Sequence, residues 1–162
     1  MTAETPKRSP RLHRLETIFV RSPIYFVTGC THNRRKLLAN AAVHETFRGF
    51  AHEGPGRGAW IGAYVLMPDH LHLFVAIDDE KISLANWMKS LKNAISKRLR
   101  ANGTAPPHWQ KTFFDHLLRS EDSYSEKWNY VRENPVRAGF VKQWEDWPFR
   151  GEIFALECRS EG

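Results

Sequence analysis

Two histidines one residue apart lie within an apolar run, His70-Leu71-His72-Leu73-Phe74. A β-strand sends alternate side chains to one face of its sheet, so His70 and His72 are expected to point the same way. Two imidazoles on one face supply half of a metal site, or two donors directed at an anion. The alternative is that the two histidines have only a structural role. A buried strand has little structural reason to carry two histidines, so this pair is the first candidate for chemistry.

A tyrosine late in the chain is the second candidate. The apolar stripe of a helix expected over about residues 122–134, and stopped by Pro135, is formed by side chains at i, i+4 and i+7: Tyr124, Trp128 and Val131. Tyr130 lies about 120° from that stripe, and Asn134 lies one turn beyond it on the same face. The sequence therefore favours Tyr130 as a reactive phenol and Tyr124 as a core residue.

These groups form one site if the late helix crosses the histidine strand. A divalent ion, Mg²⁺ or Mn²⁺, held by His70, His72 and Asn134 can polarise a phosphodiester, and mixed nitrogen and oxygen ligation suits Mn²⁺ better. The Tyr130 phenol can attack phosphorus and become the covalent carrier. The set predicts metal-dependent cleavage and rejoining of a phosphodiester.

The elements that must position these residues are typical of an α+β domain. Strands are expected at about residues 24–28, 60–67, 70–77 and 113–119, and further helices at about 40–53 and 83–100. The Pro68-Asp69 turn predicts an antiparallel hairpin between the second and third strands. We expect one antiparallel sheet with helices packed mainly on one face. We expect residues 1–17 to form a flexible basic arm, 18–150 the domain and 151–162 a C-terminal tail.

Composition narrows the class of protein. The chain of 162 residues suits one domain, and its net charge of +6 permits a nucleic-acid partner. Cys30 and Cys158 are too few and too far apart for a disulfide framework, which indicates a reducing cytosol. No apolar stretch approaches the roughly 20 residues of a membrane span. We expect a cytoplasmic protein with no membrane partner.

Basic side chains are clustered in three places: the arm, a short loop and the longest helix. The candidate DNA contacts are Arg11 and Arg14, then Arg34, Arg35 and Lys36, then Lys89 and Lys92. The alternative for the helix is an ordinary solvated face.

The segment Met67–Leu73 resembles the HUH motif (His, hydrophobic, His) of single-tyrosine transposases, and Tyr130–Val141 resembles their nucleophile helix and the turn after it. The segments between and beyond also fit: Trp109-Gln110, Phe114-Asp115-His116, Leu118-Arg119 and Trp144 to Phe149. The similarity spans roughly residues 18–150 and is greatest to the REP-associated tyrosine transposases.

The resemblance implies a ferredoxin-like HUH nuclease fold. It implies metal-dependent cleavage and joining of single-stranded DNA beside a hairpin, through a 5′-phosphotyrosine and a free 3′-OH. It assigns His70 and His72 as ligands, Tyr130 as nucleophile and Asn134 as third ligand. Asp69 stands where the family often has Asn. A monomer or homodimer at the nucleoid of a prokaryotic cell is expected.

Two other functions remain open. One is a module that binds hairpin DNA or RNA without cutting it. The other is a metallohydrolase using both histidines with Asp69 or Asp115, although Asp69 next to His70 on a strand would face the opposite way. His116, on the fourth expected strand, is assigned a supporting role beside the ligands. The other histidines are expected at the surface: His13, His32, His44, His52 and His108.

Overall fold

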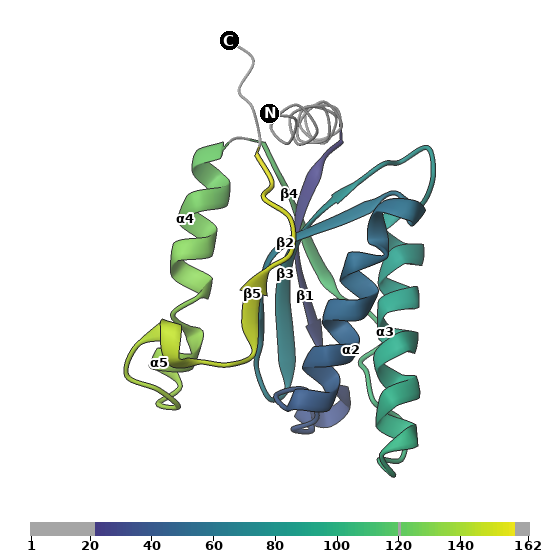
Figure 1. The fold of residues 1–162 in the computed structure, drawn as a ribbon, viewed down its shortest axis with the longest axis vertical. Helices are drawn as coiled ribbons and strands as arrows, with labels where there is room; N and C mark the ends of the chain where they lie inside the picture. The colour runs from purple at the N-terminus through teal and green to yellow at the C-terminus, as the bar shows by residue number, and fades with distance from the viewer. Residues whose placement is uncertain (1–21, 120, 158–162) are drawn as a thin grey trace, which may run out of the picture.

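A computed structural model describes residues 22–119 and 121–157. Its elements are, in chain order, β1 (Ile24–Cys30), η1 (His32–Arg34), α2 (Ala41–His52), η2 (Gly54–Arg57), β2 (Ala59–Leu66), β3 (His70–Ile77), α3 (Leu84–Ala101), β4 (Phe114–Leu118), α4 (Glu121–Val131), α5 (Asn134–Arg137), η3 (Trp144–Asp146) and β5 (Arg150–Glu152) (Figure 1). Five strands form one antiparallel sheet in the order β4-β1-β3-β2-β5. The expected α+β class is confirmed.

The hairpin between β2 and β3 holds the two histidines at a fixed place. β3 starts at His70 and ends at Ile77, the bounds that the alternating pattern predicts. The turn closes where the Met67 amide donates to the His70 carbonyl at 2.8 Å. A tight turn fixes the pairing register, so it also fixes the sheet face to which each histidine points.

One face of the sheet is covered by the two longest helices. Apolar side chains of β3 alternate into this core, together with a stripe from α3: Leu71, Leu73, Val75 and Ile77, then Trp87, Met88, Leu91, Ile95 and Leu99. Both helices start at capped residues, since the Asn40 side chain accepts from the Val43 amide and the Ser83 hydroxyl from the Asn86 amide. This face is the main hydrophobic core.

The opposite face is covered by α4 together with Phe154 and Leu156 of the segment after β5. Figure 1 shows the sheet nearly edge-on, with α4 on one side and α2 and α3 on the other. Phe74 of β3 lies in the smaller core on the α4 side, where its ring stacks on Tyr124 at a centroid distance of 4.3 Å. The two longest helices thus share one face, as expected, and α4 leaves part of the other face uncovered.

The C-terminal part of the described chain adds a strand that the sequence did not predict. β5 pairs antiparallel with β2, so the sheet continues past the domain boundary expected at residue 150. Just before it, the Trp147 indole donates to the Leu66 carbonyl at 3.0 Å. Residues 1–17, the expected arm, lie outside the described residues. Within 22–119 and 121–157, no helix is long and apolar enough to cross a membrane.

Candidate active site

The two histidines lie at the start of β3 on the α4 side of the sheet. Leu71 between them points into the main core, so the imidazoles point away from it. Their ring centroids are 4.9 Å apart, with the ring planes at 77°. The structure therefore brings the imidazoles of His70 and His72 together, as the sequence predicts.

Each imidazole is oriented through its Nδ1 atom. Thr28 Oγ1 on the adjacent strand β1 lies 2.8 Å from Nδ1 of His72. The Asp69 carboxylate accepts a hydrogen bond from Nδ1 of His70, also at 2.8 Å. Partners at Nδ1 leave the Nε2 lone pairs for a metal ion, which is the usual arrangement of ligating histidines in proteins. The two histidines therefore fit the role of metal ligands.

Asp69 does not face away from His70, which corrects the expectation made for two neighbours on one strand. It lies in the turn before β3, where side chains do not follow strand alternation. Its second oxygen accepts from Arg34 Nε at 3.0 Å. The hydrogen bonds to His70 and Arg34 outweigh burial and lower the pKa of the Asp69 carboxyl. Asp69 thus acts as a hydrogen-bond partner of His70 and stays ionised.

The environment of His72 keeps its ring neutral. Burial, followed by the positive charges of His70, Arg137 and Lys127, lowers the pKa of His72 to about 3. A neutral imidazole is the form that coordinates a metal ion. Two of these charges, Arg137 and Lys127, come from the α4 and α5 region.

The helix α4 presents two different faces. One packs on the sheet through the predicted stripe of Tyr124, Trp128 and Val131. The other follows the same helical spacing and faces β4, where it borders a pocket of about 330 Å³ with residues of that strand: Ser123, Glu126, Lys127 and Tyr130, with His116 and Leu118. The offset between the two stripes is the one that the sequence predicts.

Tyr124 is part of the core. Its hydroxyl accepts from the Ala63 amide at 3.1 Å, where β2 has a bulge, and a Cβ at Gly62 would meet this hydroxyl at 2.5 Å. Burial raises the pKa of Tyr124 far above that of an ordinary phenol. A buried phenol that resists ionisation is a poor nucleophile, so Tyr130 remains the candidate.

Tyr130 is exposed and held by one arginine. Its side chain is 65% exposed. The Arg137 guanidinium lies 3.9 Å from the ring centroid and donates to the Tyr130 carbonyl at 2.7 Å. A cation over an aromatic ring is attracted to it, so Arg137 fixes the ring without burying the hydroxyl.

A chain of contacts connects the C-terminal half of α4 to His72. The Phe26 ring on β1 stacks on the His72 imidazole at a centroid distance of 5.3 Å. On Phe26 lies the Lys127 ammonium, 5.2 Å from the ring centroid. Tyr130 is three residues beyond Lys127 on the same helix face. The structure therefore brings Tyr130 to the end of the sheet that carries the histidines.

Asn134 is placed differently from the prediction. α4 ends at Val131, and Asn134 begins the short helix α5, because Pro135 sits in the first turn of a new helix instead of ending the old one. The Asn134 side-chain oxygen contacts Arg137. Among the described residues no three His, Cys, Asp or Glu side chains gather as a metal site.

The predicted cationic contacts fall into two groups in the structure. Arg34 is paired with Asp69, Arg35 donates to the carbonyls of Ala105 and Pro107, and Lys92 donates to the carbonyls of Gln110 and Thr112. Lys36 and Lys89 are exposed. Arg11 and Arg14 lie outside the described residues. Only Lys36 and Lys89 therefore resemble free contacts for a phosphate backbone.

His116 is exposed on β4 and pairs in register with Phe26, so it faces the same side as His72. It lines the same pocket as Tyr130. Asp115, its neighbour, pairs with Val27 of the main core and so faces the other side. That placement removes one carboxylate that a metallohydrolase would need.

Four functional candidates were missed in the sequence. They are Thr28, Phe114, Lys127 and Arg137, and only the pairing register and the tertiary contacts identify them.

Two other histidines were expected at the surface, but the structure does not place them there. His108 is 3% exposed, and its ring nitrogens lie 2.9 Å from Ser96 Oγ and 3.0 Å from the Thr104 carbonyl. His44 is half-buried and lies 2.7 Å from the Tyr64 hydroxyl. Both have buried polar partners that a helical pattern does not reveal.

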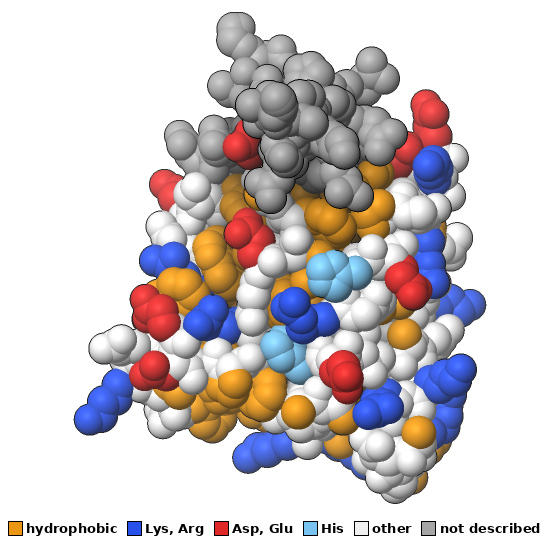
Figure 2. All heavy atoms as spheres, viewed as in Figure 1, with side chains coloured by type: hydrophobic (Ala, Val, Ile, Leu, Met, Phe, Trp, Pro, Cys, Tyr) orange, Lys and Arg blue, Asp and Glu red, His pale blue; other side chains and the backbone are white. Residues whose placement is uncertain are grey.

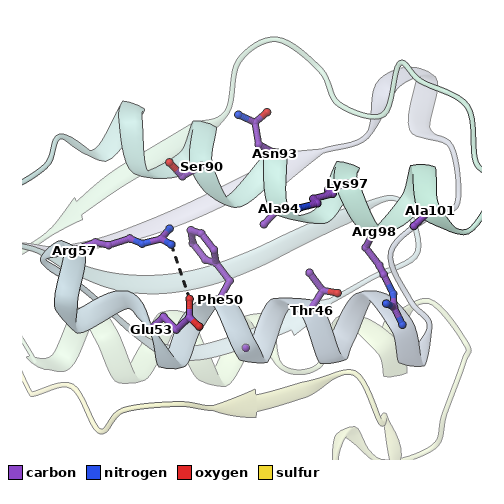
Figure 3. A pocket seen from close by; sticks show the side chains of 11 residues that line it. Thr46, Phe50, Glu53, Arg57, Ser90, Asn93, Ala94, Lys97, Arg98 and Ala101 are labelled. Atoms are coloured by element: carbon purple, nitrogen blue, oxygen red, sulfur yellow. Dashed lines mark ion pairs between the residues drawn. The ribbon is translucent and has the colours of Figure 1, made fainter.

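A larger hollow of about 670 Å³ lies between α2 and α3, on the far side of the sheet (Figure 3). Figure 3 shows the Glu53–Arg57 ion pair at one end of it and Lys97 and Arg98 along α3. Its lining holds neither an imidazole nor a phenol. In the view of Figure 2, acidic and basic side chains are intermingled over the face of the molecule that is shown. The candidate chemistry lies on the α4 side.

Comparisons with known proteins identify a family and a fold. A family model described as Transposase IS200 like matches residues 20–133. A REP-associated tyrosine transposase of Escherichia coli (strain K12) is 24% identical over 131 residues, which cover 81% of this chain and 77% of that protein. A Haemophilus influenzae protein that provisionally bears the same name is 23% identical over 141 residues, which cover 81% of this chain and 80% of that protein.

A solved structure shares the fold. It is a REP-associated tyrosine transposase bound to a REP hairpin, and it superimposes with a TM-score of 0.66 at 24% identity. The superposition covers 87% of this chain and 94% of the other.

Proposed function

Because the chain belongs to the IS200-like transposase family, we propose that it cleaves and rejoins single-stranded DNA beside a hairpin, with Tyr130 as the nucleophile. The observation that carries this proposal is the placement of an exposed phenol at the histidine end of the sheet, next to Arg137 and Lys127. Tyr124, the other tyrosine of α4, packs against the smaller core, and its hydroxyl accepts a hydrogen bond from the Ala63 amide.

His70 and His72 would hold a divalent ion, Mg²⁺ or Mn²⁺, with Asn134 as third ligand. Thr28 and Asp69 occupy the Nδ1 sides of the rings, which leaves both Nε2 atoms available. When bound, the ion would polarise the scissile phosphate and stabilise its developing charge. Asn134 can serve only if its amide oxygen leaves Arg137.

The chemistry of the chain's own residues is a transesterification. The Tyr130 oxygen forms a bond to phosphorus and the bond from phosphorus to the 3′ oxygen breaks. The phenol gives up its proton and the departing 3′ oxygen takes one up, which leaves a 5′-phosphotyrosine and a free 3′-OH. Lys127 and Arg137 supply positive charge where the phosphate must approach. Attack by another 3′-OH reverses the step and rejoins the strand without ATP.

The proposed partner is hairpin DNA with an unpaired flank. The family, the names of the relatives and the hairpin bound in the similar structure support this choice. We further propose that the protein acts in the cytoplasm, at the nucleoid of a prokaryotic cell, as a monomer or homodimer.

A covalent adduct is the decisive product. The protein is incubated with Mn²⁺ and a labelled hairpin oligonucleotide carrying single-stranded flanks, and adducts are separated on a denaturing gel. Wild type and Tyr124→Phe are expected to form the adduct, and Tyr130→Phe is expected to form none, because Tyr130 is exposed whereas the Tyr124 hydroxyl accepts from the Ala63 amide. Equal adduct from Tyr130→Phe would refute the assignment. Tight hairpin binding with no adduct under any metal would indicate a non-cleaving module instead.

A further inference from the structure

Phe114 is the most exposed large apolar side chain among the described residues, at 76%. Its neighbour Phe113 packs against the main core, below the Lys92 ammonium. Alternation along the chain therefore sends Phe114 to the opposite side of the sheet, the side of α4. The question is what this ring contacts there.

Strand pairing places Phe114 in one row with the candidate site. Thr28 of β1 is paired with Phe114 of β4 on one side and with His72 of β3 on the other. Adjacent strands lie about 4.8 Å apart, so the Phe114 backbone is roughly 10 Å from that of His72. The Phe114 ring thus stands at the rim of the site, on the edge strand.

The Tyr130 pocket begins two residues further along the same face of β4, at His116. His116 lines this pocket of about 330 Å³ with Lys127 and Tyr130. α4 runs back along β4 after a short connection, so its Tyr130 end is level with the Phe114 end of the strand. An aromatic face, an imidazole, an ammonium group and the phenol are thus adjacent.

This combination matches the chemistry of a nucleotide. An exposed ring offers a stacking surface to a base of any sequence, and cationic groups offer contacts to its phosphate. The volume is at the lower limit for small-ligand sites. The exposed neighbours of Phe114 along the chain include Lys111 and Thr112, and the pocket on the same face of β4 is lined mainly by polar and charged residues, which is not typical of an apolar protein interface.

We propose that Phe114, together with His116 and Lys127, forms a subsite for one unpaired nucleotide next to the scissile phosphate, with the base stacked on the Phe114 ring. This inference rests on the proposed function and adds to it the feature that positions the single strand. Glu126, the acidic residue of the pocket, offers an acceptor to an amino group of the base.

The test uses Tyr130→Phe as background, so that binding is measured without cleavage. Affinity for a labelled hairpin oligonucleotide with single-stranded flanks is measured by fluorescence anisotropy, and single abasic sites are moved through the flanks. One abasic position is expected to weaken binding about ten-fold, as loss of one stacked base does. Phe114→Ala is expected to weaken binding of the intact strand by the same factor and to be insensitive to that abasic position.

Two further variants sharpen the result. Phe114→Trp is expected to retain affinity, because it keeps the aromatic face. Phe140→Ala is the matched control, since it removes another exposed phenylalanine, one that stacks on Trp147. Its affinity and its abasic profile are expected to match those of the background protein.

Two outcomes overturn the inference. One is an unchanged affinity and abasic profile in Phe114→Ala. The other is a change of oligomeric state in Phe114→Ala with unchanged DNA affinity, which would make the ring a contact between protein copies. The adduct assay separates the two proposals. If the wild-type protein forms the adduct but Phe114→Ala leaves DNA binding unchanged, only the subsite is refuted. If Phe114→Ala abolishes the effect of one abasic position but no adduct forms, only the nuclease proposal is refuted.

Discussion

The two faces of the sheet are built from the same strands and differ in what covers them. On one face, α2 and α3 cover the apolar side chains of β3. On the other, α4 covers only part of the surface, and two imidazoles, a phenol and an exposed phenylalanine remain at its margin. Alternation along β3 gives one face Leu71 and Leu73 and the other His70 and His72.

The difference separates stability from chemistry. A sealed apolar face contributes free energy of folding, and its side chains tolerate little change. A partly covered face can carry polar groups at the edge of solvent, where a phosphate can reach them. The hollow between α2 and α3 is the larger of the two hollows described above, yet the groups suited to phosphoryl transfer line the other face.

The strongest test of this separation concerns stability. Leu73→Ala removes a side chain that is 0% exposed in the main core and is expected to lower the free energy of unfolding by about 2–5 kcal/mol. Tyr130→Ala, on the other face, is expected to change it by less than about 1 kcal/mol. Urea unfolding monitored by tryptophan fluorescence measures both. A loss in Tyr130→Ala as large as that in Leu73→Ala would contradict the separation.

The next test measures the rate of adduct formation instead of stability. His72→Ala is expected to reduce the rate of adduct formation by at least about 100-fold, because the loss of a metal ligand costs several kcal/mol of charge stabilisation. His52→Ala removes an exposed histidine from α2 and serves as the matched control. Rates are measured on denaturing gels under single-turnover conditions. Similar rates in His72→Ala and His52→Ala would remove His72 from the chemistry.

A smaller effect is expected from the residue that orients His72. Thr28→Val keeps the shape of the side chain and removes the hydroxyl beside Nδ1, and it is expected to weaken Mn²⁺ binding about 10- to 100-fold. Thr28→Ser restores the hydroxyl and is expected to restore most of the affinity. Isothermal titration calorimetry measures the dissociation constants. Equal Mn²⁺ affinity in wild type and Thr28→Val would show that the hydroxyl does not position the ring.

Elements with strong local signals could be predicted from the sequence. β3 was predicted with its observed bounds because a Pro-Asp turn precedes an alternating run. The longest helix starts after its predicted cap, Ser83. The spacing of Tyr124, Trp128 and Val131 identified the buried stripe of α4 and so distinguished the two tyrosines.

Features that depend on tertiary contacts could not be predicted. β5 has only three residues, and its pairing with β2 defines it as a strand. Pro135 stops a helix or starts one according to the chain before it, and here it starts α5. In Phe113-Phe114, alternation shows that the rings face opposite sides but not which side is covered.

The residues of the candidate site could be predicted from the sequence more fully than the contacts between them. The positions of His70 and His72 on one face follow from strand period alone. The hydrogen bonds of Asp69 and Thr28 depend on the turn and on the strand beside β3, which no local pattern encodes.

Peptide mapping of the protein–DNA adduct by mass spectrometry tests the central claim most directly. After nuclease trimming and proteolysis, the mass of a nucleotide phosphate is expected on one peptide, with fragment ions that locate it on Tyr130. The same mass on Tyr124 or on any other side chain would contradict the assignment of the exposed phenol of α4 as the nucleophile.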